Sequence, residues 1–188
     1  MATTQKPDAP ASSISQWRVD PVHTRAEFAV KHLMITTVRG HFADVDGTVH
    51  EDSADPSRSS IEVSLKAASV DTGVEQRDAH LRSGDFFDAE QFPALTFRST
   101  RIAPAGEGKL KVTGDLTIKG VTKPVVLDVT EEGRGGDPWG GNRAGFSATT
   151  RIDRRDFGLN WNQALEKGGW AVAHEVKINL DIQLVRQD

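Results

Sequence analysis

Apolar and polar residues alternate along most of the chain, which is the pattern of half-buried β-strands. In residues 24–32 every second position forms a mostly apolar set, or parity, that includes Phe28 and ends at His32. Mostly charged residues occupy the positions between, which are the other parity. Residues 170–184 form the longest such run, interrupted on its apolar side only by His174. The runs add up to about eight strands, each with one apolar face, and this predicts an all-β antiparallel fold.

Two positions depart from regular alternation. The apolar parity switches near Ala43 and Asp44, which predicts a bulge or bend. Gly114 lies on the inward parity of a continuous strand over residues 110–118. An inward glycine indicates a bend or a place where another group packs against bare backbone.

One segment, residues 71–93, does not alternate at all. Thr72 and Glu75 have the spacing of a capping box, and Gly84 suits the left-handed residue that ends a helix. The segment therefore predicts one short helix at about residues 73–83, polar over most of its surface and near one end of the strands. The aromatic residues after it are expected to anchor it in the core: Phe86, Phe87 and Phe92.

Eight antiparallel strands with one apolar face suit a closed barrel, because closure leaves no exposed strand edge. Strands of about ten residues would be about 34 Å long, so the barrel is expected to be elongated. At this strand number the interior is either filled by side chains or large enough for one ligand. A two-sheet sandwich is the competing architecture, since strand count alone fits both.

Length and composition narrow the class of protein. The 188 residues fit one domain, which we place at residues 16–188, after a tail at residues 1–15 that is rich in Ala, Ser, Thr and Pro and expected to be disordered. A net charge of −4 argues against a nucleic-acid partner, and the absence of cysteine excludes disulfides and thiolate metal sites. Neither a signal peptide nor a membrane-spanning run is evident, so a cytoplasmic location is expected.

The sequence contains no motif typical of catalysis. No GxSxG nucleophile motif, phosphate loop or dinucleotide fingerprint occurs, so we predict a protein that is not an enzyme. HxH and HExxH patterns are also missing. A metal site would need the two inward histidines, His32 and His174, together with Asp78 or His80, and we predict none.

The predicted helix carries the most polar run of the chain. Arg77 and His80 are three residues apart and therefore share a helix face. They could form a polar cluster at a cavity mouth that binds a head group or fastens a lid. They could equally belong to a solvated face with local ion pairs.

Four stretches resemble, in order and spacing, the YceI-like family of polyisoprenoid-binding, lipocalin-like proteins. They are WRVDPVHTRAEFAVKHLMITTVRGHF (17–42), RDAHLRSGDFFDAEQFPALTFRS (77–99), GDLTIKGVTKPV (114–125) and RRDFGL (154–159). Together with the final alternating strand, the resemblance covers roughly residues 16–186. It implies an elongated eight-stranded antiparallel lipocalin-like β-barrel, a central hydrophobic pocket for a long isoprenoid or similar amphiphile, and no enzymatic activity.

Strand parity and the motifs suggest which residues would meet such a ligand. The predicted head-group residues are His32, Arg77, Asp78, His80, Asn162 and His174. The predicted tail-lining residues are Phe28, Val30, Val38, Phe42, Val63, Leu65, Phe86, Phe92, Phe97, Leu116, Ile118, Leu127, Phe146, Trp161, Trp170, Val176, Ile178 and Leu180.

The leading hypothesis is non-enzymatic binding, sequestration or transport of a polyprenyl chain, an isoprenoid quinone or a fatty amide. No cofactor is expected other than such a bound polyisoprenoid or quinone-like lipid. The alternative is an enzyme that uses cavity histidines on a lipidic or quinone substrate. A third hypothesis is a structural or stress-response protein whose barrel is filled by its own side chains. Both a monomer and a homodimer are compatible with the sequence.

Overall fold

The computed structural model describes residues 14–187, and residues 1–13 of the predicted tail lie outside this range. The predicted boundary of the tail is wrong by two residues, because Ile14 and Ser15 belong to the first strand. No helix formed by the described residues combines the length and the apolar character needed to cross a membrane. The strands are β1 (Ile14–Val19), β2 (Arg25–His32), β3 (Thr36–Phe42), β4 (Val45–Asp52), β5 (Ser60–Lys66), β6 (Val70–Asp71), β7 (Ala94–Gly106), β8 (Lys109–Ile118), β9 (Val121–Gly136), β10 (Asn142–Asp153) and β11 (Val172–Arg186).

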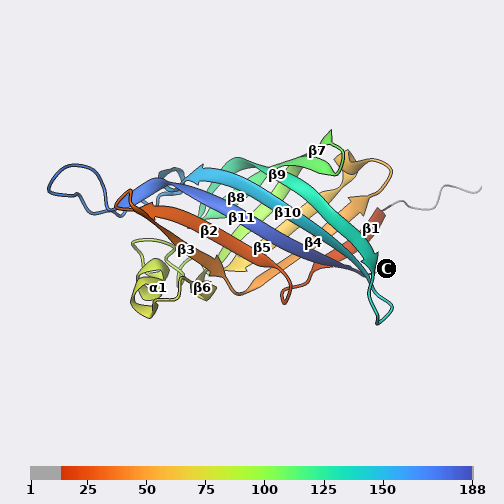
Figure 1. Ribbon diagram of the computed structural model, residues 1–188, viewed down its shortest axis with the longest axis horizontal. Coiled ribbons are helices and arrows are strands. Elements are labelled where there is room, and N and C mark those ends of the chain that lie inside the picture. Colours follow the sequence, from red (N-terminus) through yellow and green to blue (C-terminus); the bar gives the residue numbers. More distant parts are fainter. Residues whose placement is uncertain (1–13, 188) are drawn as a thin grey trace, which may run out of the picture.

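Eight of these strands close into an antiparallel barrel. Their order is β1-β4-β5-β7-β8-β9-β10-β11, and pairing of β1 with β11 completes the ring. Closure confirms the predicted barrel and excludes the sandwich. The 15 residues of β11 would span roughly 50 Å as an extended strand. The barrel is accordingly long and narrow (Figure 1).

Strand β11 has two successive neighbours on one side. Its first part pairs with β2, where Phe28 lies opposite Ile178, and its last residues pair with β1, where Val19 lies opposite Leu184. Strands β1 and β2 therefore occupy one position around the barrel, one after the other. The same holds for β3 and β4, because the predicted break at residues 43–44 separates them. The β2, β3 and β6 segments extend the barrel towards α1 (Figure 1).

The helix α1 spans Glu75–Arg82, as the sequence predicts, but its ends differ from the prediction. Val74 is the N-cap residue and makes no side-chain cap, so the Thr72–Glu75 capping box is wrong. Thr72 instead donates its backbone N–H and its hydroxyl to the Asp78 carboxylate inside the helix. The helix ends at an extended Ser83. Gly84 is not left-handed, because the Ser83 N–H and hydroxyl already bond the His80 carbonyl.

Two apolar clusters pack at different places along the barrel. One lies beside α1 and includes Phe42, Phe86, Phe87 and Phe157. Phe86 and Phe87 are buried there, and the ring of Phe87 meets that of Phe42 edge-on at 5.4 Å. The anchoring role predicted for these two aromatics is confirmed. The second cluster gathers around Trp17, with side chains from β1, β4, β10 and β11.

The inward glycine of β8 accommodates an aromatic ring. A Cβ placed on Gly114 would lie 2.4 Å from Cζ of Phe97, so the ring rests directly on the glycine backbone. The expectation that something packs against bare backbone is confirmed. The same arrangement recurs where the ring of Phe28 covers Gly40. At both positions the missing side chain of glycine leaves room for a large ring against the backbone.

Candidate functional site: a cavity along the barrel axis

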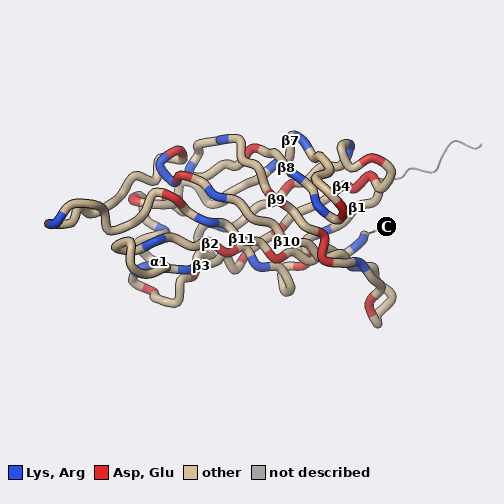
Figure 2. Tube along the Cα trace, turned by 45° about the horizontal axis from the view of Figure 1, so that its top comes forward, with Lys and Arg blue, Asp and Glu red and all other residues tan. Residues whose placement is uncertain are grey.

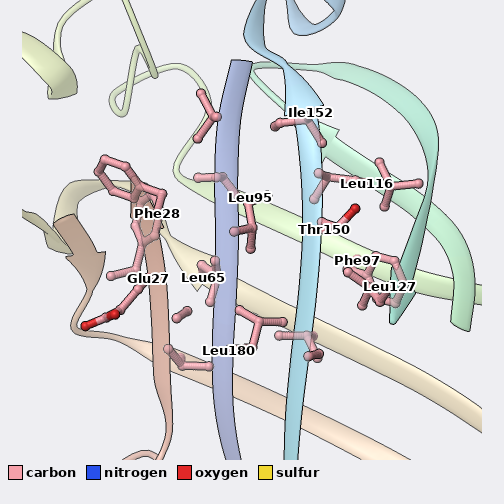
Figure 3. Close-up of a pocket in the computed structure, with 18 of the residues that line it drawn as sticks. Glu27, Phe28, Leu65, Leu95, Phe97, Leu116, Leu127, Thr150, Ile152 and Leu180 are labelled. Carbon is pink, nitrogen blue, oxygen red and sulfur yellow. The ribbon is translucent and has the colours of Figure 1, made fainter. Parts of the chain in front are cut away.

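A cavity of about 1170 Å³ runs inside the barrel. Its wall is made largely of apolar side chains that point inward from many strands. Figure 3 shows Phe28 of β2, Leu65 of β5, Phe97 of β7, Leu127 of β9 and Leu180 of β11 around one shared space. The period-two pattern of each strand thus produces a continuous apolar lining.

The interior is hollow although the inward residues are large. Leu127, Ile178 and Leu180 line the cavity and are only partly buried. The hypothesis of a barrel filled by its own side chains predicted a close-packed interior and is therefore wrong. A methylene group is close in size to a water molecule, which takes about 30 Å³ of liquid. The space can hold about 40 such groups, or about eight five-carbon prenyl units.

The predicted tail-lining residues lie along this wall, except for Phe92 and Trp170. Phe92 packs outside the cavity on the turn after β8, where a Cβ on Gly120 would lie 2.7 Å from its ring. Trp170 precedes β11, in a bridge with Ala164, and its side chain is half exposed. For these two residues parity fails because neither belongs to a barrel strand.

Three of the predicted head-group residues line the cavity at its α1 end: His32, Arg77 and His80. The Nε2 atom of His80 lies 2.8 Å from the Asp85 carboxylate. Its ring stands edge-on to Phe86 and to Trp161, at centroid distances of 5.1 and 4.6 Å. His80 is therefore fixed on three sides while still facing the cavity.

Asp78 does not line the cavity but fastens α1 to the segment before it. Its side chain is buried and accepts hydrogen bonds from the N–H and the hydroxyl of Thr72, at 2.9 and 2.5 Å. Arg77 also donates to Thr72, from Nε to the Thr72 Oγ1 and from Nη2 to the Thr72 carbonyl oxygen. Asp78, a predicted head-group residue, is therefore held against Thr72 outside the cavity lining.

Asn162 and His174 also lie outside the cavity lining. The Asn162 amide bonds both backbone groups of Val172, donating to its carbonyl and accepting from its N–H. The register of β11 against β2 shifts between Val172 and Val176, so the residues between them leave the regular strand. Both valines line the cavity, but His174 does not.

Arg154 is a buried residue of the site that we did not predict. It is 4% exposed, lines the cavity, and donates to the carbonyl oxygens of Leu159, Trp161 and Ala173 at 2.6 to 2.9 Å. Burial lowers the pKa of Arg154 from its usual value, and the guanidinium still keeps its charge at neutral pH. The RRDFGL stretch thus places Trp161 at the cavity mouth through backbone contacts that alternation does not reveal.

A second polar group lies in the cavity lining away from α1. Arg134 of β9 bonds both carboxylate oxygens of Glu51, at 2.6 and 2.8 Å, and also bonds Glu131. Hydrogen bonds to the two carboxylates raise the pKa of Arg134. The guanidinium lies 5.6 Å from the ring centroids of both Trp17 and Phe146. Such cation–π contacts add to the ion pairs.

Sequence reasoning missed this group because residues 131–143 look like a Gly-rich loop. In the structure β9 continues to Gly136, and a register shift beside Phe146 absorbs the irregularity. The available signal was Glu131, which continues the inward parity of Leu127 and Val129. Among residues 14–187, no three His, Asp or Glu side chains are grouped so that they could hold a metal ion.

Known proteins are similar to this chain in sequence and in fold. A family model described as the YceI-like domain matches residues 17–184. A UPF0312 protein of Pseudomonas putida strain W619 is 41% identical over 165 residues, which is 88% of this chain and 82% of that protein. The crystal structure of Burkholderia cenocepacia BcnA is 30% identical, with a TM-score of 0.76 over 88% of this chain and 98% of BcnA.

A more distant structure shares the fold. It is a polyisoprenoid binding domain from Saccharophagus degradans, 14% identical, with a TM-score of 0.67 over 91% of this chain and 98% of that domain. The family match spans nearly the whole barrel, and the predicted motifs lie within it. This chain belongs to the YceI-like domain family.

Proposed function

We propose that this protein binds one long-chain isoprenoid or a similar amphiphilic lipid in the barrel cavity and shields its tail from water without converting it chemically. The observation that carries the proposal is the elongated apolar cavity of about 1170 Å³. An eight-stranded barrel can enclose one ligand, and this cavity is larger and more apolar than a polar metabolite needs. The similar fold of the polyisoprenoid binding domain from Saccharophagus degradans supports the same ligand class.

The tail would supply most of the affinity. Each buried methylene contributes about 0.8 kcal/mol, so a five-carbon prenyl unit contributes at most about 4 kcal/mol. Several units would exceed the ceiling of roughly 18–21 kcal/mol for non-covalent binding. Ordering of the chain and of the cavity mouth must offset much of this gain. We infer that His32, Arg77 and His80 mainly set the orientation of the head group.

Native mass spectrometry of the freshly purified protein tests the proposal, combined with organic extraction of whatever it releases. One stoichiometric isoprenoid, quinone or fatty amide is the expected result. An empty protein that also takes up no polyprenol or isoprenoid quinone on titration from detergent would contradict lipid binding.

The rival hypothesis is an enzyme acting on such a lipid. The His80–Asp85 pair is the observation that favours it, because a carboxylate beside an imidazole is a common general-base arrangement. Incubation of isoprenoid quinones and polyprenyl esters with the protein, followed by mass analysis of the extracted lipid, separates the two hypotheses. We expect the lipid to be recovered unchanged, whereas a changed mass that depends on His80 would favour the enzyme.

A further inference from the structure

The turn between β2 and β3 exposes three consecutive apolar side chains. Leu33, Met34 and Ile35 are 39%, 69% and 77% exposed. Leu33 and Met34 have φ angles of 53° and 58°, and the Ile35 N–H bonds the His32 carbonyl. A turn whose two central residues are both left-handed favours Asn and Gly at those positions. Large apolar residues are thus unfavourable here, at Leu33 and Met34 for the backbone conformation and at Met34 and Ile35 for hydration.

Trp170 extends this apolar surface. Its side chain is 50% exposed, and the next residue, Ala171, accepts a hydrogen bond from the Leu33 N–H at 2.8 Å. We call Leu33, Met34, Ile35 and Trp170 the apolar rim. His32 and Ala171, the chain neighbours of Leu33 and Trp170, both line the cavity. The apolar rim is therefore continuous with the cavity mouth.

Basic side chains accompany the apolar rim. Lys31 and Arg39 lie on β2 and β3, and Lys167 lies on the loop that projects beyond them (Figure 2). Within the described part of the chain none of the three forms an ion pair with a carboxylate. The basic residues that do form one are Arg18, His23, Arg25, Arg58, His80, Arg82, Arg98, Lys111, Arg134, Arg143, Arg151 and Arg155.

Three acidic groups near this end form ion pairs. Glu27 pairs with Arg25, Glu75 with Arg82, and Asp85 with His80. Glu166 lies next to Lys167 in sequence, and Asp71 accepts a backbone hydrogen bond from Gly73. Among these groups Lys31, Arg39 and Lys167 outnumber the two carboxylates without an ion pair, Glu166 and Asp71, although the whole chain has a net charge of −4.

We propose that the apolar rim, with Lys31, Arg39 and Lys167, docks the barrel onto a bilayer that contains anionic lipids, with the cavity mouth against the membrane. Tryptophan favours the membrane interface, exposed apolar side chains can enter it, and lysines attract anionic head groups. A second copy of the chain fits less well, because a twofold contact would bring the same positive charges together. The inference deepens the proposed function, since a bilayer is where a long isoprenoid dissolves.

Vesicle flotation with the full chain tests the docking. Vesicles of phosphatidylcholine with phosphatidylglycerol are compared with vesicles of phosphatidylcholine alone, at low and high salt. We expect binding to the anionic vesicles that weakens as salt screens the charges. Lys31→Gln and Lys167→Gln each remove one positive charge, and each should weaken binding to anionic vesicles by about fivefold. The rim variant, which combines Met34→Asn with Ile35→Glu, should abolish vesicle binding. Asparagine is chosen because it tolerates the left-handed turn.

Two exposed residues elsewhere provide matched controls. Val22, in the β1–β2 loop, is 82% exposed, and Trp139, in the β9–β10 hairpin, is 84% exposed. Val22→Glu and Trp139→Glu should leave flotation unchanged. Circular dichroism and thermal unfolding confirm that every variant is folded.

Several outcomes would overturn docking by the apolar rim: flotation that survives the rim variant, flotation lost with Trp139→Glu instead, or a salt-independent signal. A dimer that the rim variant dissociates, without any vesicle binding, would identify the surface as an interface between copies.

Uptake of a polyprenol from detergent separates the two proposals. Uptake without flotation contradicts docking alone, and flotation without uptake contradicts lipid binding alone. The rim variant should retain uptake from detergent and lose uptake from vesicles.

Discussion

The ring of His80 stands edge-on to the indole of Trp161, with 4.6 Å between the ring centroids. His80 belongs to α1, and Trp161 belongs to the segment that connects β10 to β11. The contact therefore joins two separate parts of the chain across the cavity mouth. Asp85 and Phe86 fix the imidazole from α1's own side of the mouth. A ligand head group at this end would meet a positioned imidazole rather than a mobile one.

Replacing His80 by alanine should weaken selection between head groups more than binding of the tail. A hydrogen bond contributes about 1 kcal/mol, which is about fivefold in relative affinity. Competition between a polyprenol, its phosphate and a quinone with the same tail measures this selectivity. Arg82→Ala is the control, because Arg82 is on the same helix but pairs with Glu75 outside the cavity lining. Equal weakening for all three lipids would show that His80 does not read the head group.

Arg134 is expected to limit the length of the bound tail. Its guanidinium is fixed within the cavity lining by Glu51 and Glu131 and by the rings of Trp17 and Phe146. Arg134→Ala should let the cavity accept polyprenols longer by at least one prenyl unit. Because Arg134 is 36% exposed, solvent screens the ion pairs, and we expect a stability loss of only about 1 kcal/mol.

A ladder of polyprenols differing by one prenyl unit, competed against a labelled lipid, measures the length limit. Lys111→Ala is the matched control, since its ion pair with Asp128 is exposed. An unchanged length preference in Arg134→Ala would show that the tail does not reach this group.

Alternation was sufficient to predict the barrel and most of the cavity wall, because a strand has only two faces and one must be apolar. Phe28, Leu127 and Ile178 line the cavity where parity predicts. The prediction fails where the backbone leaves the ladder. His174 lies in the irregular part of β11, between Val172 and Val176, and its parity no longer determines its direction.

Polar contacts were harder to predict because they depend on tertiary geometry. Arg134 and Glu51 are 83 residues apart in sequence, and no local pattern connects them. Asp78 looks like one more polar residue on a helix, yet the same carboxylate is buried against Thr72. The three carbonyls that Arg154 bonds belong to irregular backbone, which has no period to read.

Substitution of Gly114 by alanine should destabilise the barrel by about 1–3 kcal/mol. A Cβ there would lie 2.4 Å from the Phe97 ring and 2.6 Å from the Arg98 carbonyl oxygen. The control is Gly135→Ala, because a Cβ at Gly135 meets nothing within 4 Å. Urea unfolding of both variants measures the difference.

The double variant Gly114→Ala with Phe97→Ala separates the ring from the backbone. Removing the ring should reduce the penalty at Gly114 without eliminating it, because the Arg98 carbonyl remains. Additive effects of the two substitutions would mean that the ring does not rest on the glycine.

Asp20 should make the stability of the barrel depend on pH. Burial alone would raise the pKa of Asp20, but hydrogen bonds from His23, Arg143, the Val22 N–H and Gln183 outweigh it and lower the pKa from 3.8 to about 2. A lowered pKa stabilises the folded state above the unfolded value, and this contribution is lost as pH falls from 3.8 to about 2. The shift corresponds to about 2 kcal/mol at neutral pH.

Urea unfolding of the wild type and of Asp20→Asn, repeated from neutral pH down to about pH 3, measures this contribution. The difference in unfolding free energy between the two proteins should be largest near neutral pH and should narrow below about pH 4, as the wild-type carboxylate takes up its proton. Asp46→Asn is the control, because Asp46 pairs with Arg18 while its side chain stays 66% exposed. That pair should contribute little at any pH. A constant difference between wild type and Asp20→Asn across the range would mean that shape, rather than charge, makes Asp20 important.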